Sequence, residues 1–228
     1  MEQKLAIRLR NKEICPISTK SEDSIKIGAP VVVKTSRGEE FGEIVAFPNK
    51  YPSNTSKEIQ LKKVLRYATE QDIRNNDLLQ EKEESVLLTA AEKAGEFELP
   101  LKIISAEYLF DCKKLYLYYR VPKDKKVKDI RDFRRDLSST FKTEITLRSI
   151  TGRDEAKHIG GLGPCGRNLC CANWLNKPKH ITVKMVKEQG FQISPTRTSG
   201  LCGRLMCCFN YELEKKAPRQ ARSNKNDR

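Results

Sequence analysis

A twelve-residue motif that occurs twice constrains this chain more than any other feature. Segment 163–174, GPCGRNLCCANW, aligns with segment 200–211, GLCGRLMCCFNY, at an offset of 37 residues. The shared pattern is G-x-C-G-R-x-x-C-C-x-N-aromatic, with seven identities in twelve positions. An internal repeat that cannot bury its own surface tends to pack against its twin. We therefore expect the two cysteine blocks to form one structural neighbourhood. They contain six of the eight cysteines: Cys165, Cys170, Cys171, Cys202, Cys207 and Cys208.

Several roles are open for these thiols. A disulfide framework is disfavoured, because Met1-Glu2-Gln3-Lys4-Leu5 does not resemble a secretory signal and cytosolic thiols stay reduced. Zinc usually takes four ligands from C-x(2–4)-C pairs, whereas the spacing here is C-x4-C-C and only His158 and His180 supply imidazoles. Iron–sulfur clusters accept C-x4-C spacing. Buried core cysteines and reactive redox thiols beside Arg167 and Arg204 remain alternatives.

The glycine and arginine of each block fit a cofactor site. Gly166 and Gly203 allow a close backbone approach, and backbone N–H groups there could bond to cluster sulfides. Arg167 and Arg204 would offset the charge of several thiolates. Because neighbouring side chains on a helix diverge, both members of each Cys-Cys pair are not expected to bind one metal equally. One member of each pair would then pack in the core or face another subunit.

The hydrophobic periodicity before the repeat predicts an α+β protein. Residues 1–68 form a β-rich N-terminal unit, in which Leu5, Ile7 and Leu9 alternate with other residues and 31–46 form a hairpin of the kind found in small barrels. Residues 69–98 form a helical segment, with Thr69 and Asp72 as a capping box and Gly95 as a stop signal.

Three further segments complete the predicted organisation. Residues 99–150 form a strand-strand-helix-strand layer, with strands at 101–110, 114–121 and 144–150 and a helix over 127–137 lying on an antiparallel sheet. Residues 151–213 form the duplicated Cys-rich metal or cluster region. Residues 214–228 form a disordered basic tail, because no aromatic or branched apolar side chain offsets the cost of ordering it.

The charge distribution favours contact with a polyanion or an acidic partner. The chain has 44 Lys and Arg against 30 Asp and Glu, a net charge of +14, and +9 of it falls in residues 161–228. No apolar stretch reaches the roughly 18 residues of a membrane helix, so we expect no membrane insertion and a cytoplasmic location. No phosphate loop, H-E-x-x-H motif or other catalytic constellation occurs. The sequence therefore favours a non-enzymatic protein.

The segments GGLGPCGRNLCCANWL, VKMVKEQGFQISPTRTSG and LCGRLMCCFNYE, within 160–212, closely resemble the RicT (YaaT) family of stage-zero sporulation regulators with a polymerase-suppressor-type C-terminal domain. The resemblance extends more loosely over about residues 1–212. It implies a non-catalytic subunit of a complex with two small helical partners, RicA and RicF. It further implies [4Fe–4S] clusters, control of the endoribonuclease RNase Y in mRNA maturation, and effects on sporulation, competence and biofilm development. The six repeat cysteines match the family's cysteine positions, whereas Cys15 and Cys112 are expected to be packing residues.

Three functional hypotheses follow. The first is an iron–sulfur adaptor that regulates RNA processing through partner proteins. The second is a zinc- or cluster-bearing nucleic-acid-binding module that uses the basic C-terminal third. The third is a thiol redox protein. Because the repeat has few aromatic side chains for base stacking, we expect RNA contact to be weak and non-specific.

Overall fold

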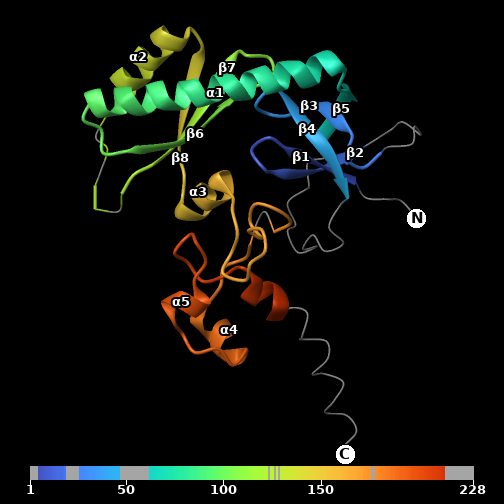
Figure 1. Ribbon diagram of the computed structural model, residues 1–228, viewed down its shortest axis with the longest axis vertical. Coiled ribbons are helices and arrows are strands. Elements are labelled where there is room, and N and C mark those ends of the chain that lie inside the picture. Colours follow the sequence, from blue (N-terminus) through green and yellow to red (C-terminus); the bar gives the residue numbers. More distant parts are fainter. Residues whose placement is uncertain are drawn as a thin grey trace, which may run out of the picture. The chain divides into compact units, whose positions relative to one another are not determined.

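The computed structural model describes residues 5–18, 26–46, 62–122, 124–125, 127, 129–175 and 178–213. The chain divides into two compact units, residues 1–150 and 151–228 (Figure 1). The predicted disordered tail at 214–228 lies outside the described residues. The α+β class predicted from the sequence is confirmed, because strands and helices share the first unit and helices recur in the second.

The N-terminal strands close into a small barrel, in the order β1-β2-β5-β3-β4. The strands are β1 (Leu5–Leu9), β2 (Ile14–Ser18), β3 (Pro30–Lys34), β4 (Glu39–Ala46) and β5 (Lys62–Tyr67). The predicted hairpin is confirmed: β3 and β4 pair antiparallel, with Val32 opposite Phe41. Branched apolar side chains fill the barrel, among them Ile7, Val31 and Ile44, with Cys15 beside them. The period-2 pattern of the sequence thus marks a true β core.

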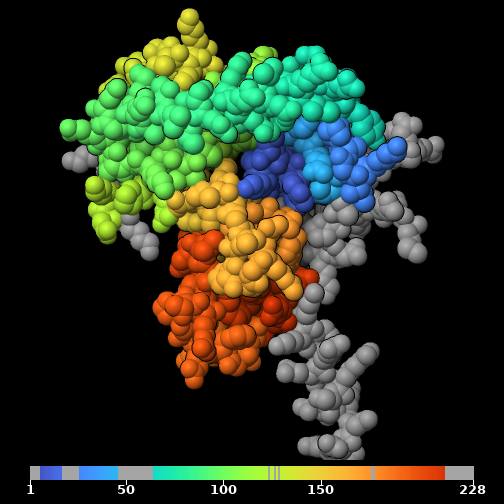
Figure 2. Space-filling view, viewed as in Figure 1, coloured from blue at the N-terminus to red at the C-terminus, as the bar shows by residue number. Residues whose placement is uncertain are grey.

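One long helix, α1 (Glu70–Glu96), follows the barrel. Its N-terminus is the predicted capping box, because the Asp72 N–H donates to the Thr69 side chain and the Thr69 N–H donates to the Asp72 carboxylate at 2.8 Å. Arg66 of β5 forms an ion pair with the same carboxylate. The helix continues through Gly95 and ends where the Phe97 N–H donates to the Lys93 carbonyl. Figure 2 shows α1 at the surface of the first unit along its length.

A three-stranded sheet in the order β6-β7-β8 completes the first unit. Its elements are β6 (Lys102–Tyr108), β7 (Lys114–Arg120), α2 (Arg131–Phe141) and β8 (Glu144–Ser149). The predicted β6–β7 hairpin is confirmed. The prediction of a wholly antiparallel sheet is wrong: β8 runs parallel to β7, because α2 carries the chain back across the sheet before β8 begins. The helix starts at Arg131, later than predicted, since the Asp129 carboxylate accepts the Arg131 N–H at 2.9 Å.

Both helices of the first unit cover one face of this sheet. Val86 and Ala90 of α1 and Phe133 and Leu137 of α2 pack with Leu117 of β7 in one buried cluster. At roughly 25 cal/mol per Å² of apolar surface removed from water, this cluster is a main source of stability for the layer.

Two ion-pair networks join the barrel to the sheet and helix. Arg10 pairs with Glu83 of α1 at 2.5 Å. Arg37, in the β3–β4 turn, pairs with Glu40 at 2.5 Å and with Glu107 of β6 at 3.0 Å. Burial alone lowers the pKa of Arg37, but the hydrogen bonds and charges of Glu40 and Glu107 outweigh burial and raise its pKa. These side chains fix the barrel against the layer.

The second unit consists of short helices and tight turns. Its helices are α3 (Gly152–Ile159), α4 (Val183–Glu188), α5 (Pro195–Thr198) and a helical segment at 208–213. Ile181, Val186 and Phe209 form its buried cluster. No helix in the described part of the chain is both long enough and apolar enough to cross a membrane.

Candidate functional site

The two copies of the cysteine motif adopt the same backbone structure. An isolated β-bridge joins Leu162 to Asn168 in the first copy and Ser199 to Leu205 in the second. The first glycine of each copy donates its N–H to the carbonyl of the motif arginine, at 2.8 Å in the first and 2.9 Å in the second. Each pair of equivalent positions is separated by the same offset of 37 residues. The sequence repeat is therefore also a structural repeat.

The glycine of each C-G-R segment makes the tight turn. Gly166 and Gly203 both have φ of +71°, and each donates its N–H at 2.9 Å to the carbonyl of the glycine three residues earlier. No atom lies within 4 Å of a Cβ built on either residue. The turn thus requires glycine for its left-handed backbone, because a side chain is disfavoured there even where space is open.

Thiols of the two copies lie close enough to shift one another's pKa. The Cys207 thiol hydrogen-bonds the Cys170 sulfur, which lowers the pKa of Cys170 and raises that of Cys207. Burial raises the pKa of Cys171, and the nearby Cys202 raises it further. Burial also raises the pKa of Cys208 to about 11, to which the charges of Glu212, Cys170 and Cys165 add. The prediction that both blocks share one neighbourhood is confirmed.

The thiols of the first copy affect those of the second in the same way as the second affect the first. Cys170 and Cys207 hold equivalent positions in the motif, so their pair maps onto itself. Likewise, the charge of Cys165 raises the pKa of Cys208, and the charge of the equivalent Cys202 raises the pKa of Cys171. The aromatic positions also meet, because Trp174 and Tyr211 stack edge to face with ring centroids 4.5 Å apart. The interactions between the two copies therefore follow an approximate two-fold symmetry within the chain. The 37-residue spacing in the sequence does not by itself specify this symmetry.

The electrostatic surroundings of the thiols are mixed. The positive charge of Arg167 helps to lower the pKa of Cys170, as the sequence suggested. The carboxylate of Glu212 has the opposite effect on both Cys170 and Cys208. Arg204 is exposed, like Arg167. Exposure differs between thiols: Cys165 is exposed, Cys171 is buried, and the other four repeat thiols are intermediate.

The six thiols are the right ligand type for a metal that prefers thiolates, but they are not grouped around one point. Six sulfur atoms from two copies are the ligand type that Zn²⁺ and iron–sulfur clusters select. Among the described residues, no three His, Cys, Asp or Glu side chains are placed together as ligands of one ion. The described arrangement thus brings thiols of both copies near one another without grouping three of them around one position.

The two remaining cysteines lie apart from the repeat. Cys15 is buried in the barrel core, so its predicted packing role is confirmed. The same prediction for Cys112 is wrong: Cys112 is exposed in the turn between β6 and β7. It takes the left-handed position of that turn, with φ of +56°, which directs it away from the core.

Two contacts beside the thiols were not predicted from the sequence. The Trp174–Tyr211 pair could have been found from their shared motif position, given that the copies pack together. The Gln189 side-chain amide donates to the carbonyls of Met185 at 3.1 Å and Phe209 at 2.7 Å, and so ties α4 to the helical segment of the second copy. Nothing in the sequence around Gln189 indicates this bridge.

Comparison with known proteins adds independent information. Residues 62–150 match the family described as PSP1 C-terminal conserved region, and residues 180–218 match the third domain of PSP1-like proteins. The first of these segments covers β5, α1 and the sheet layer, and the second covers the second cysteine block. No solved structure matches this chain.

Two curated proteins are similar to the chain. The Stage 0 sporulation protein YaaT of Bacillus subtilis is 41% identical over 186 residues, which are 80% of this chain and 65% of that protein. An uncharacterised protein of Schizosaccharomyces pombe is 27% identical over 157 residues, which are 57% of this chain and 20% of that protein. The chain therefore spans less than two thirds of the length of each relative.

Proposed function

Because this chain belongs to the family of PSP1-like proteins that includes the sporulation protein YaaT, we propose that it is a non-catalytic regulatory subunit that carries an iron–sulfur cluster. It acts with two small helical proteins resembling RicA and RicF. The complex directs RNase Y-dependent mRNA processing and thereby influences sporulation, competence and biofilm development. It works in the cytoplasm.

The contact between the two copies of the motif, which together contain six thiols, is the observation that carries this proposal. The Cys207 thiol hydrogen-bonds Cys170 across the two copies, and Cys165 and Cys202 each raise the pKa of a thiol of the opposite copy. Iron–sulfur clusters need several thiolates, and their stability depends on the charges and hydrogen bonds around the sulfur atoms. One cluster that draws ligands from both copies uses this arrangement best.

The ligand set consists of thiols of the repeat: Cys165, Cys170, Cys171, Cys202, Cys207 and Cys208. When bound, the [4Fe–4S] group supplies a redox-sensitive structural link between the two copies. Arg167 and Arg204 lie next to the cysteine turns and offset thiolate charge. The site thus acts through assembly with partners, without a reacting substrate.

Anaerobic purification of the full chain tests the cluster. We expect a brown protein with broad absorption near ~400 nm and with iron and acid-labile sulfide in equal amounts. Cys165→Ser and Cys202→Ser should each lose iron and weaken assembly with the partners, since a neutral hydroxyl does not replace a thiolate ligand. Bound zinc without sulfide would instead identify a zinc centre.

Cys112→Ser and Cys15→Ser are the matched controls, because both thiols lie outside the repeat. Cys112→Ser is the cleaner control, since Cys112 is exposed whereas Cys15 packs in the barrel core. Both variants should retain the iron content of the parent protein. Equal loss of iron in all four variants would argue against the repeat as the cluster site.

The hydrogen-bonded pair Cys170–Cys207 favours a second candidate, a thiol redox protein. In that case the two thiols lose two electrons and two protons to hydrogen peroxide, which becomes two waters, and a disulfide forms. Iron-free protein treated with peroxide and mapped by mass spectrometry tests this. A Cys170–Cys207 disulfide that thiols reverse in protein devoid of cluster supports the second candidate.

A further inference from the structure

The free edge of the three-stranded sheet has a recognisable binding geometry. β8 is the outermost strand of the order β6-β7-β8, and no described strand pairs with its other side. The Ile150 N–H donates to the Tyr119 carbonyl of β7 at 2.9 Å. Because alternate residues of a strand direct their N–H and C=O groups to the same side, the backbone groups of Ile145, Leu147 and Ser149 face away from β7. They are available to another strand.

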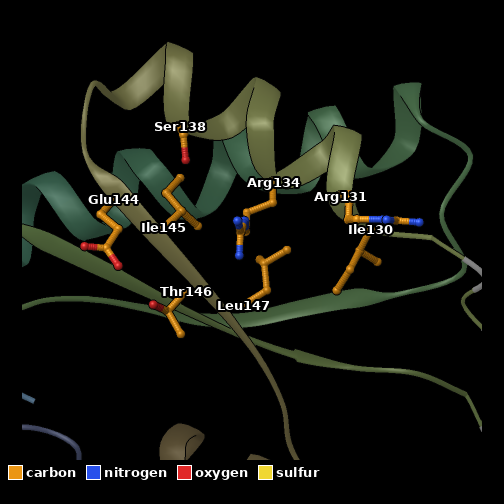
Figure 3. Close-up of a pocket in the computed structure, with 8 residues that line it drawn as sticks. All are labelled: Ile130, Arg131, Arg134, Ser138, Glu144, Ile145, Thr146 and Leu147. Atoms are coloured by element: carbon orange, nitrogen blue, oxygen red, sulfur yellow. The ribbon is translucent and has the colours of Figure 1, made fainter.

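A hollow of about 360 Å³ runs along this edge, between α2 and β8. Figure 3 shows Ile145 and Leu147 on the helix side of β8 and Thr146 on the other side. Side chains from both faces of one strand line the same hollow only if the hollow follows the strand's edge. Six of the residues that line the hollow form the proposed binding surface. They are Ile130, just before α2, Arg134 and Ser138 of α2, and Ile145, Thr146 and Leu147 of β8.

Arg134 gives the hollow its charge. Its guanidinium lies between α2 and β8 in Figure 3, among the residues that line the hollow. Arg131 pairs with Asp129 at 3.0 Å and Arg135 pairs with Asp132 at 3.3 Å. Within the described residues, no carboxylate lies within ion-pair distance of Arg134. The hollow therefore combines an apolar floor, a free strand edge and one cation that lacks an anion.

We propose that this edge binds an extended, acidic segment of a partner protein. The segment adds a fourth strand beside β8, and its backbone pairs with the outward groups of Ile145, Leu147 and Ser149. Side chains on its helix side alternate with those facing the other side. A carboxylate on the helix side meets Arg134, while a neighbouring apolar side chain rests on Ile130 and Leu147. This surface belongs to the first unit, contains no residue of the cysteine repeat and does not depend on a cluster.

The composition of the hollow favours a peptide over RNA. Branched apolar side chains form its floor, and none of its lining residues is aromatic, whereas single-strand RNA sites use aromatic platforms for bases. Glu144 lines one end of the hollow, where its carboxylate pairs with Lys114 of β7 at 3.6 Å. One unpaired guanidinium matches one carboxylate better than a run of phosphates, and Arg–carboxylate pairs are often bidentate.

The test uses the full chain and two defined peptides. The acidic probe is an acetylated, amidated nonapeptide of sequence Val-Thr-Asp-Thr-Val-Thr-Asp-Thr-Val, which carries Val and Asp on the same face of a strand, and its counterpart has Lys in place of each Asp. Nuclear magnetic resonance of the ¹⁵N-labelled protein follows the amides of Ile145, Leu147 and Ser149. We expect the acidic probe to shift these signals and slow their hydrogen exchange by about tenfold, whereas the basic probe has no effect.

Arg134→Ala should weaken binding of the acidic probe by about tenfold, because a charge-assisted hydrogen bond is lost. Arg135→Ala is the matched control, since Arg135 lies on the same helix but pairs with Asp132, and it should bind like the parent. Equal binding of both peptides, or binding unchanged in Arg134→Ala, would overturn the proposal. So would the same amide changes on addition of an RNA oligonucleotide or on self-association of the chain without peptide. Loss of iron from the repeat leaves all these outcomes unaffected, so the two proposals fail independently.

Discussion

Gly166 and Gly203 occupy equivalent turns with the same positive φ, which makes them sensitive tests of the repeat's geometry. Gly203→Ala should lower the free energy of unfolding of the second unit by about 1–2 kcal/mol, because the left-handed backbone disfavours a Cβ. Trp174 is the single tryptophan of the chain and contacts Tyr211, so its fluorescence during urea unfolding reports on this unit. Gly166→Ala should have an effect of the same size.

Gly95→Ala is the control for this pair. Gly95 lies inside α1, with no atom within 4 Å of a Cβ built on it. Alanine should therefore stabilise the helix by about 0.5–1 kcal/mol, as measured by circular dichroism during unfolding. Destabilisation by alanine at all three positions would show that the positive φ of the repeat turns is not the cause.

Single residues also mark the limit of what the sequence predicts. Thr69 and Asp72 were identified as a cap because a capping box is a local pattern, complete within four residues. The cysteines were identified as one neighbourhood because of the repeat, but the pairing of Cys170 with Cys207 depends on how the copies face each other. Cys112 was assigned to packing from its chemistry alone, whereas its turn position leaves it exposed. Ligand roles within the repeat stay predictions.

At the level of elements, the start of α1 depends on one carboxylate. A hydrogen bond from Arg66, together with the Thr69 N–H, holds the pKa of Asp72 well below its ordinary value of about 3.9. A carboxyl whose folded pKa is depressed stabilises the fold above its unfolded pKa, and this stability is lost as pH falls toward the folded pKa. Asp72→Asn should thus be less stable than the parent at neutral pH. The difference in stability between the two proteins should become smaller below about pH 4.

Thermal unfolding followed by circular dichroism from pH 7 to pH 2 measures this gap. Thr69→Ala removes the other half of the capping box and should cost about 1 kcal/mol. A gap between Asp72→Asn and the parent that stays constant over the whole pH range would mean that Asp72 acts without its charge.

The joint between barrel and sheet depends on the Arg37 network. Glu107→Gln removes one of two carboxylates from a largely buried arginine and should lower the free energy of unfolding by about 3 kcal/mol. Tyr118→Phe deletes the neutral hydroxyl that donates to Glu107 at 2.7 Å and accepts from Arg37 at 2.9 Å, and should cost about 1 kcal/mol. Urea unfolding by circular dichroism compares the two. A larger loss in Tyr118→Phe would contradict the charge-based account.

The direction of β8 shows why element types are easier to predict than their arrangement. Alternation over 144–149 indicates a strand whichever way it pairs, because side chains change faces with a period of two in both directions. The parallel pairing with β7 arises from the path of α2, which is a tertiary feature. One hairpin likewise suggested a barrel, but closure of the barrel requires β5. No local sequence pattern predicts that β5 pairs with β2 and β3.

For the whole molecule, the excess of positive charge predicts weak and unselective RNA binding. The net charge of +14 attracts any polyanion, and neutralising phosphates releases counterions, so affinity falls steeply with salt. Fluorescence anisotropy of the isolated chain with a processed transcript and an unrelated RNA should give equal curves that vanish as salt is added. Tight binding at physiological salt that distinguishes the two RNAs would favour the nucleic-acid-binding module over the adaptor.

Because both copies of the cysteine motif lie in one chain, their contact does not weaken when the protein is diluted. Two half-sites on separate chains meet at a rate set by protein concentration, and they separate when the protein becomes scarce. Here residues 175–199, which include α4 and α5, hold both halves in one polypeptide, so their meeting does not depend on protein concentration. Each molecule therefore keeps both copies of the repeat together, even when a cell holds only a few molecules.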